Sequence, residues 1–278
     1  SVLLLTGCWD RREINDIAFI QATAIDWEKN KFRVTFQYPL VGQMGGSKGG
    51  GGGTSGSRTW YLDSDVGSTL TEALETVQHG VSRFLYSAHR RVLLIGEEMA
   101  KRGTSAALDI MVRLPENRIT AQIYVTHGQA REVLATPVHI ETMSAEKIRE
   151  LAIEFMQQPV MIKHFMNAIM SDGLDPYAPV IESLSTSDGK ANQLGSKIRL
   201  RGIAVFRNDK LAGFLNEEEM FGPLFIMNQL NHPSMTIKSP REKGTIAVRF
   251  TDYKVKMTPV IQNDDIRIRL DIKGIYNI

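Results

Sequence analysis

The sequence predicts a mixed α/β or α+β fold, in which an N-terminal mixed sheet with packed helices precedes a second domain of antiparallel strands and one helix. Two observations support this prediction. From residue 18 to residue 134, short runs rich in β-branched and aromatic residues alternate with segments whose apolar residues recur at helical spacing, which favours helices layered on a sheet. After residue 197, runs that alternate apolar and polar residues follow one another closely, which favours antiparallel hairpins.

The first elements are predicted to be a β-hairpin and a capped helix. Residues 18–25 and 31–38 flank a polar turn, and the alternation in the second run gives it one buried face. Thr69 and Glu72 have the spacing of a capping box, so a helix is expected at about residues 69–79. Further along, the pattern predicts a strand at 92–95, helices from 97 and at 104–112, a strand at 119–126 and a short helix at 129–134.

The second half begins with helices and ends with strands. Residues 144–170 are predicted to form two helices, because Pro159 interrupts their helical pattern. Asn216 is predicted to cap a helix that runs to about residue 230. The strands of the second domain are expected at residues 203–206, 211–214, 245–250, 253–257 and 266–276.

These elements divide the chain into a signal-peptide remnant at residues 1–7, an N-terminal domain at 8–190 and a second domain at 197–278. Residues 42–57 are rich in Gly and Ser, so they are expected to form a flexible loop. The last residues have the pattern of a strand, so we expect the second domain to be incomplete. The chain would then continue beyond Ile278, and an apolar face would remain where the missing part packs.

The charge balance excludes one class of function. Lys and Arg number 33 and Asp and Glu number 31, and the basic residues are spread along the chain instead of forming a stripe. Binding to nucleic acid is therefore not expected, because it requires a concentrated positive surface. No stretch reaches the run of about 20 apolar residues that a membrane-spanning helix needs.

The single cysteine, Cys8, is the most informative residue of the sequence. One cysteine can form neither an internal disulfide nor a thiolate-rich metal site. It follows a run of leucines, and the tetrad of residues 5–8, L-T-G-C, resembles the bacterial lipobox, whose cysteine receives a lipid. A lipid with two acyl chains would hold a domain of this size on a membrane. The alternative is that Cys8 is a small buried hydrophobic residue at the start of a strand.

The sequence shows no constellation for catalysis, cofactor binding or metal binding. Its six histidines include no H-x-x-x-H pair, and no G-x-S-x-G elbow marks a serine nucleophile. The carboxylates at 97–98 and 217–219 have positions typical of helix starts and solvated faces. His89 is expected to make a structural hydrogen bond. We therefore predict that the chain is not an enzyme.

Several blocks in the sequence resemble the Ger(x)C family of spore-germination lipoproteins. Residues 8–15 match the pattern C-W-D-x-x-E-I-N, and residues 89–103 match H-x-x-V-L-L-I-G-E-E-x-A-x-x-G. Residues 113–116, 202–206 and 211–213 follow in the order of the family. The glycine run at 49–53 departs from the family pattern.

The resemblance implies a non-catalytic C subunit of a nutrient germinant receptor, with a lipid on Cys8 at the outer face of the spore inner membrane. Its implied partners are the integral membrane A and B subunits. Trp9, Asp10 and Glu13 stand beside the anchor, so we expect them to contact these partners. Which germinant is sensed, and whether this subunit binds a small molecule, stay open.

The alternative from another class is a lipid-anchored solute-binding protein of a transporter. That function requires a deep cleft between two similar α/β lobes, whereas the second half of this sequence predicts antiparallel hairpins. A deep pocket between lobes would favour solute binding, and co-purification with membrane subunits would favour the receptor.

Overall fold

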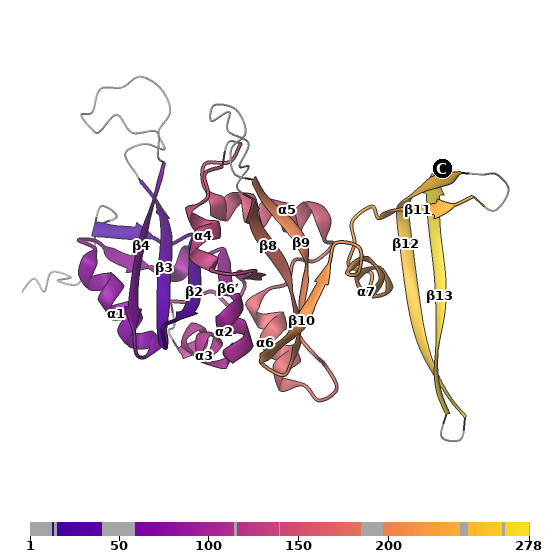
Figure 1. The fold of residues 1–278 in the computed structure, drawn as a ribbon, viewed down its shortest axis with the longest axis horizontal. Helices are drawn as coiled ribbons and strands as arrows, with labels where there is room; N and C mark the ends of the chain where they lie inside the picture. Colours follow the sequence, from indigo (N-terminus) through magenta and orange to yellow (C-terminus); the bar gives the residue numbers. More distant parts are fainter. Residues whose placement is uncertain are drawn as a thin grey trace, which may run out of the picture.

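The structure, a computed structural model, describes residues 13, 16–40, 59–113, 116–138, 140–184, 197–239, 244–262 and 265–277. Its centre is an eight-stranded sheet with the strand order β10-β9-β8-β7-β6-β2-β3-β4 (Figure 1). The strands of this sheet are β2 (Ala22–Glu28), β3 (Lys31–Pro39), β4 (Trp60–Gly67), β6 (Val92–Gly96), β7 (Gln122–Thr126), β8 (Tyr177–Leu184), β9 (Lys197–Arg207) and β10 (Lys210–Asn216).

The sheet is mixed. Its central strands β2, β6, β7 and β8 run parallel, whereas β3, β4, β9 and β10 add antiparallel pairs at both edges. Lys29 and Asn30 join β2 to β3 with φ angles of 48° and 60°. Two consecutive positive φ angles are typical of the tight turn that matches the twist of a hairpin. The predicted first hairpin is thus confirmed, although Ile17–Phe19 forms a separate strand, β1, which pairs with β5 (Phe84–Tyr86).

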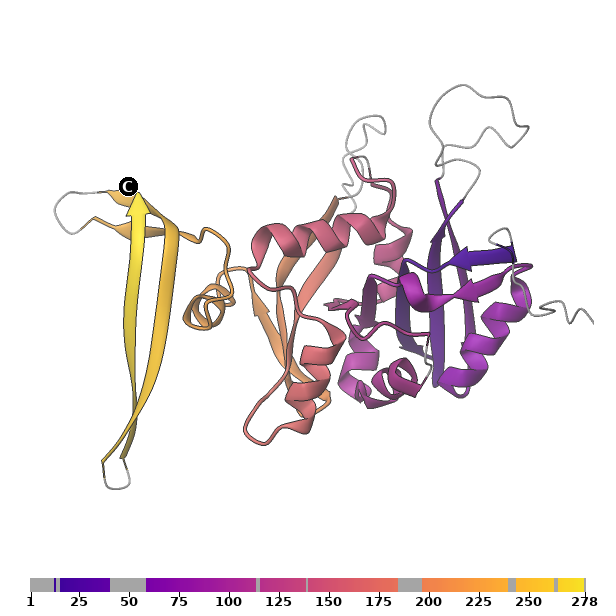
Figure 2. The ribbon, with the colours of Figure 1, turned by 180° about the vertical axis from the view of Figure 1, so that it is seen from behind.

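Helices cover both faces of the sheet. On one face, α4 (Ala130–Ala135) and α5 (Ser144–Phe155) bury the side chains of Val92 and Leu94, and Figure 2 shows α5 lying over β8 and β9. The other face packs Leu93 and Ile95 against α1 (Leu70–Gly80), α2 (Glu97–Arg102), α3 (Ser105–Arg113) and α6 (Ile162–Met170). Residues 92–95 consequently have no exposed surface, as expected for a parallel strand between two helical layers.

The C-terminal part forms a second, three-stranded antiparallel sheet that stands apart from the first (Figure 1). Its strands are β11 (Ser234–Lys238), β12 (Thr245–Gln262) and β13 (Asp265–Asn277), and the short helix α7 (Phe221–Ile226) precedes them. The ring of Phe225 stacks on that of Tyr253 at 4.5 Å, and Asn228 makes two hydrogen bonds to the backbone of Val255. These contacts connect the long hairpin to the rest of the protein.

The predicted fold class is confirmed, but some predicted elements are wrong. The helix after Asn216 covers only Phe221–Ile226, because the Asn216 side chain accepts from the amides of Glu218 and Glu219 and so caps a turn that precedes it. The two strands predicted at 245–257 are one strand, β12, with a register shift between Phe250 and Asp252. Strands β4, β5, β8 and β11 were not predicted from the sequence.

Two other predictions concern residues outside the described part of the chain. The glycine-rich loop expected at 42–57 lies outside the described residues, as do residues 185–196 at the expected domain boundary. The strands on either side of that boundary, β8 and β9, pair with each other in the eight-stranded sheet. Residues 197–216 therefore extend the sheet of the first half.

Candidate functional site

Of the residues predicted to anchor the chain or to contact partners, only Glu13 is described. Cys8, Trp9 and Asp10 lie outside the described residues. Glu13 is exposed, and its backbone oxygen accepts a hydrogen bond from the amide of Asp16 at 3.0 Å. The predicted contact segment therefore leads directly into β1.

Strand β1 connects this segment to the family-like block at 89–103. The ring of Phe19 meets the rings of Tyr86 and His89 edge-on, with centroid distances of 6.0 and 5.1 Å. His89 ends a short 3-10 helix, Ser87–His89, and is exposed. It packs against the rings of Phe19 and Tyr86, and among the described residues it does not make the predicted structural hydrogen bond.

Arg90 lies one residue further along and is buried, with 3% of its surface exposed. One terminal nitrogen donates to Asn117 Oδ1 at 2.9 Å, the other contacts the sulfur of Met111, and Nε has no partner. Burial lowers the pKa of Arg90 to about 10. No role was predicted for Arg90, because residues 89–91 alone do not show which of the two arginines is buried.

Gly96 of the same block has a structural role. The carboxylate of Asp26, at the end of β2, accepts hydrogen bonds from the amides of Ala130 and Arg131 at 2.6 and 3.1 Å, and so caps α4 from a distant strand. A Cβ atom at Gly96 would lie 2.0 Å from Asp26 Oδ1. Burial raises the pKa of Asp26, while these amide bonds oppose the shift. Glycine at 96 leaves room for this capping carboxylate.

A chain of polar contacts, which includes ion pairs of Lys101 and Arg201, follows at the carboxyl ends of β6, β7 and β8. His127 lies 3.8 Å from Glu97 and 3.4 Å from Glu182, Lys101 lies 2.8 Å from Glu97, and Arg201 lies 3.2 Å from Glu182. The hydrogen bond from Lys101 lowers the pKa of Glu97. These carboxylates already have cationic partners at a partly exposed surface. Within the described residues no group of three His, Cys, Asp or Glu side chains could hold a metal ion.

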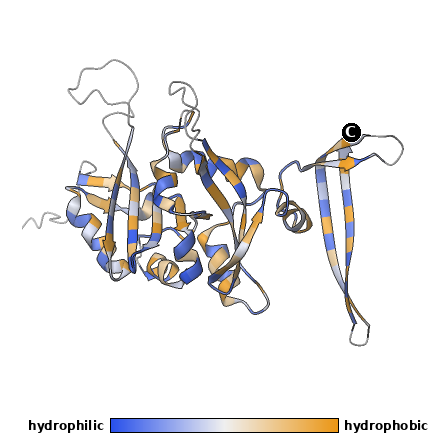
Figure 3. Ribbon diagram, viewed as in Figure 1, coloured by the Kyte–Doolittle hydropathy of each residue, from blue (hydrophilic) through white to orange (hydrophobic). Residues whose placement is uncertain are grey.

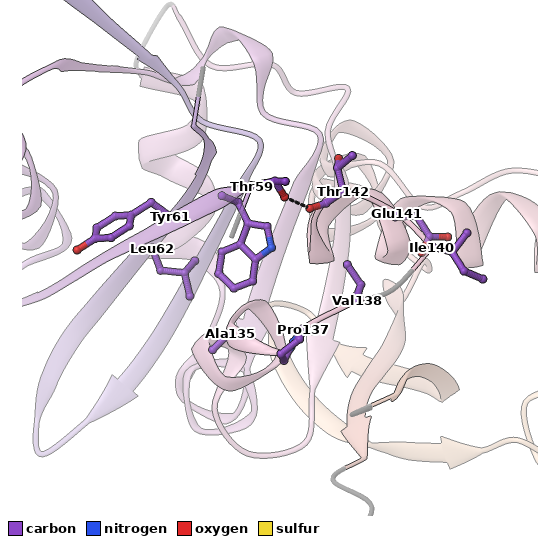
Figure 4. Close-up of a pocket in the computed structure, with 10 residues that line it drawn as sticks. Thr59, Tyr61, Leu62, Ala135, Pro137, Val138, Ile140, Glu141 and Thr142 are labelled. Carbon is purple, nitrogen blue, oxygen red and sulfur yellow. Dashed lines mark hydrogen bonds between the residues drawn. The ribbon is translucent and has the colours of Figure 1, made fainter. Parts of the chain in front are cut away.

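A groove of about 650 Å³ lies beside the edge strand β4 (Figure 4). One wall is residues 59–62, and the other is made of Ala135, Pro137, Val138, Ile140, Glu141 and Thr142. The hydroxyl of Thr59 donates to the carbonyl oxygen of Thr142 at 2.5 Å and bridges the two walls. Glu141, the carboxylate in the lining, pairs with Lys147 at 3.5 Å. The groove therefore offers surface for contact but no free charge.

The C-terminal hairpin exposes a row of apolar side chains. Ile266, Ile268, Leu270 and Ile272 alternate with polar residues along β13 and are 41–70% exposed. Figure 3 shows the alternation as bands along the two long strands. The exposed row has the alternation predicted for this strand. No helix of the described residues is long and apolar enough to cross a membrane.

Comparison with known proteins identifies the class. A family described as "Spore germination protein N-terminal domain" matches residues 10–183, and a second, "Spore germination B3/ GerAC like, C-terminal", matches residues 201–278. Both matches occur in one chain and together cover most of it. The chain belongs to this family of GerC-like spore germination proteins, which confirms the resemblance found in the sequence.

Similar sequences support the same family, and one solved structure has a similar fold. The chain is 42% identical over 272 residues to "Putative spore germination protein YfkR" of Bacillus subtilis (strain 168), a match that covers 98% of this chain and 70% of that protein. It is 28% identical over 297 residues to "Spore germination protein KC" of the same organism, covering 100% of this chain and 72% of the relative. The crystal structure of the GerBC protein has a similar fold, with a TM-score of 0.50 at 19% identity over 92% of this chain and 71% of that one.

Proposed function

We propose that this chain is the C subunit of a nutrient germinant receptor, held by a lipid on Cys8 at the outer face of the spore inner membrane. One observation carries the proposal. The two halves of the germination family match in tandem from residue 10 onward, and the L-T-G-C tetrad stands immediately before that point. A folded domain that starts a few residues after a lipidated cysteine lies within a few nanometres of the bilayer.

The proposed mode of action is contact with the integral membrane A and B subunits. Three observations support it. The ionisable groups at the carboxyl edge of the sheet pair with one another. The segment of Trp9, Asp10 and Glu13 would stand beside the anchor, and the C-terminal hairpin exposes apolar side chains. Aromatic residues near the anchor are suited to partner contacts, because Trp is enriched among residues that dominate binding energy. A solute-binding protein is not favoured, since the described strands form one eight-stranded sheet with a small two-stranded and a three-stranded sheet beside it, not two similar lobes.

The anchor is tested by Cys8→Ala in the full-length protein. We expect the variant to move from the membrane fraction to the soluble fraction, because the thioether can form only on a thiol. A Ser variant at exposed Thr71 serves as a matched surface control. Unchanged partitioning of Cys8→Ala into detergent would contradict the proposed anchor.

The contact segment is tested by replacing Trp9, Asp10 and Glu13 with Ala while Cys8 is kept. We expect a folded, lipidated protein that no longer supports nutrient-triggered germination. The matched control is His89→Gln, which should retain function provided that the ring contact with Phe19 is dispensable for folding. Full germination with the triple variant would show that this segment is not a partner contact.

A further inference from the structure

Strand β4 forms an open edge of the eight-stranded sheet. It pairs with β3 along its whole length without a register shift, and no described strand lies on its other side. The opposite edge, β10, is interrupted by a bulge between Leu211 and Gly213, and the backbone oxygen of Asp209 beside it accepts from the amide of Thr104. Bulges and covering contacts are how sheets protect their edges. Among the described strands of this sheet, β4 is therefore the edge that is available for pairing.

The pairing of β4 with β3 determines which of its backbone groups face the open edge. Opposed residues of an antiparallel pair alternate between exchanging two hydrogen bonds and exchanging none. Pro39 has no N–H and lies opposite Trp60, so this pair exchanges none, and the alternation extends the same geometry to Leu62 and Ser64. The hydroxyl of Ser64 lies 2.8 Å from that of Thr35 across the pair, the close approach typical of such positions. The N–H and C=O groups of residues 60, 62 and 64 thus point away from β3, and no described residue binds them.

Two contacts limit this open stretch of backbone. The amide of Val66, the next position that faces outward, already donates to the carboxylate of Asp65 at 2.8 Å. Before the stretch, the hydroxyl of Thr59 donates to the carbonyl oxygen of Thr142 and joins β4 to the segment that precedes α5. A partner strand that pairs with residues 60–64 would occupy the free backbone groups between these contacts.

One face of the open edge is apolar. Trp60 and Leu62 are half-buried there and pack against the core under α4 and α5. They also line the groove of about 650 Å³, whose other wall includes Val138 and Ile140 (Figure 4). Ile140 is 88% exposed. Apolar side chains of a strand added to β4 would enter this groove, because paired residues place their side chains on the same face of a sheet.

The other face of the edge is acidic. The carboxylate of Asp63 accepts a hydrogen bond from the hydroxyl of Tyr38, and that of Asp65 accepts from the amide of Val66. Neither carboxylate forms an ion pair with Lys or Arg among the described residues. Opposite charges across a strand pair are stabilising and like charges are destabilising. The edge therefore favours a partner with basic residues opposite Asp63 and Asp65.

We propose that β4 is the docking edge for an extended segment of another protein, in which apolar residues alternate with Lys or Arg. The segment adds a ninth strand to the sheet, and its backbone pairs with residues 60, 62 and 64. Its apolar side chains enter the groove, and its basic side chains face Asp63 and Asp65. The inference goes beyond the proposed receptor role and does not depend on it, so its failure would leave that role intact.

The test is fluorescence anisotropy of a labelled, capped peptide, K-V-K-V-K-V-T, titrated with the purified chain. We expect saturable binding with a Kd below about 1 mM. The acidic counterpart E-V-E-V-E-V-T keeps the apolar residues but places like charges opposite Asp63 and Asp65. It should bind at least about tenfold more weakly.

Two N-methylated forms of the basic peptide test pairing through the backbone. One carries N-methyl groups on its three valines, and the other carries them on its three lysines. Neighbouring residues of a paired strand direct their N–H groups to opposite sides, so only one of the two sets can donate to β4. We expect one form to lose at least about tenfold in affinity and the other to lose less than about threefold. Equal effects would overturn the proposal.

Variants of the chain test the position of the edge. Ser64→Pro removes an outward N–H but none that donates to β3, so it should weaken peptide binding at least about tenfold. Ser64→Ala keeps the amide and is the matched control, with an expected change below about twofold. Ile140→Ser alters an exposed side chain of the groove and should weaken binding by about threefold or more, which keeps the test decisive if Ser64→Pro fails to fold.

Several results would overturn the proposal. The first is no saturable binding of the basic peptide below about 1 mM. The second is unchanged binding by a folded Ser64→Pro variant. A dimer of the parent chain in sedimentation that Ser64→Pro dissociates would assign the edge to a second copy. Peptide binding that appears only after removal of residues 42–57 would assign the edge to that segment of the same chain.

Discussion

Strands β6 and β13 both carry runs of large aliphatic residues, yet they contribute to the protein in opposite ways. Residues 92–95 of β6 have no exposed surface, whereas Ile268 and Ile272 of β13 are 64% and 53% exposed. Fully burying one aliphatic side chain contributes about 1.5–3 kcal/mol. The free energy of folding is therefore concentrated in the eight-stranded sheet, and the hairpin keeps its apolar side chains as surface.

The largest expected difference is between two leucines. Leu93→Ala removes a fully buried side chain from β6 and should lower the free energy of unfolding by about 2–5 kcal/mol. Leu270→Ala makes the same chemical change on β13 and should cost less than about 1 kcal/mol. Urea unfolding measures both. Equal losses would show that the β13 face is covered in solution.

Gly96 and Gly213 provide a second matched pair. Gly96→Ala places a methyl group against the carboxylate of Asp26, so it should lower the free energy of unfolding by about 1–3 kcal/mol. Gly213→Ala meets open space and should change it by less than about 0.5 kcal/mol. A Gly96→Ala variant as stable as the parent would contradict the proposed need for room beside Asp26.

The buried carboxylate of Asp26 gives the stability of the eight-stranded sheet a pH dependence. Its raised pKa means that the folded state binds the proton more tightly than the unfolded state, so this group lowers stability as pH rises from the ordinary Asp pKa through the raised one. Asp26→Asn should remove that contribution. Unfolding measured between about pH 4 and pH 7 should therefore give different slopes for the two proteins, and identical slopes would argue against the shift.

The smallest expected effects come from exposed ion pairs. Arg201→Gln removes contacts with Glu182 and Glu217, and Arg267→Gln removes one with Asp265 on the hairpin. Because solvent screens both arginines, each change should cost less than about 1 kcal/mol in thermal unfolding. A larger loss of stability for Arg201→Gln would show that the ion pairs of Arg201 contribute more to folding than their exposure predicts.

Local sequence patterns predicted the helices and strands whose residues have strong intrinsic preferences for that secondary structure. The predicted cap at Thr69 was confirmed by the hydrogen bond from the Glu72 amide to the Thr69 hydroxyl at 3.1 Å, whereas the Glu72 carboxylate accepts from the amide of Ser68 instead of that of Thr69. Strand β4 was missed because Asp63 and Asp65 are poor strand formers, and they are accommodated at the sheet edge, where Tyr38 donates to Asp63. Strand β8 was missed because it contains Pro179, and proline is uncommon within strands.

Sequence patterns located the residues of the predicted site, but they did not show which of their side chains are buried. Patterns of residue type placed Cys8 and the block at 89–103 in the family. They could not show that Arg90 is buried while Arg91 is exposed, because that difference depends on contacts of the Arg90 side chain with Met111 of α3 and with Asn117. Tertiary contacts decide burial at such positions.

Affinity purification of the full-length lipoprotein from detergent-solubilised spore inner membranes tests the proposed receptor role most directly. The protein should co-purify with integral membrane A and B subunits, and the variant with Ala at Trp9, Asp10 and Glu13 should lose them while remaining lipidated. Recovery of the wild-type protein with transporter components, or without any integral membrane subunit, would contradict the proposed role.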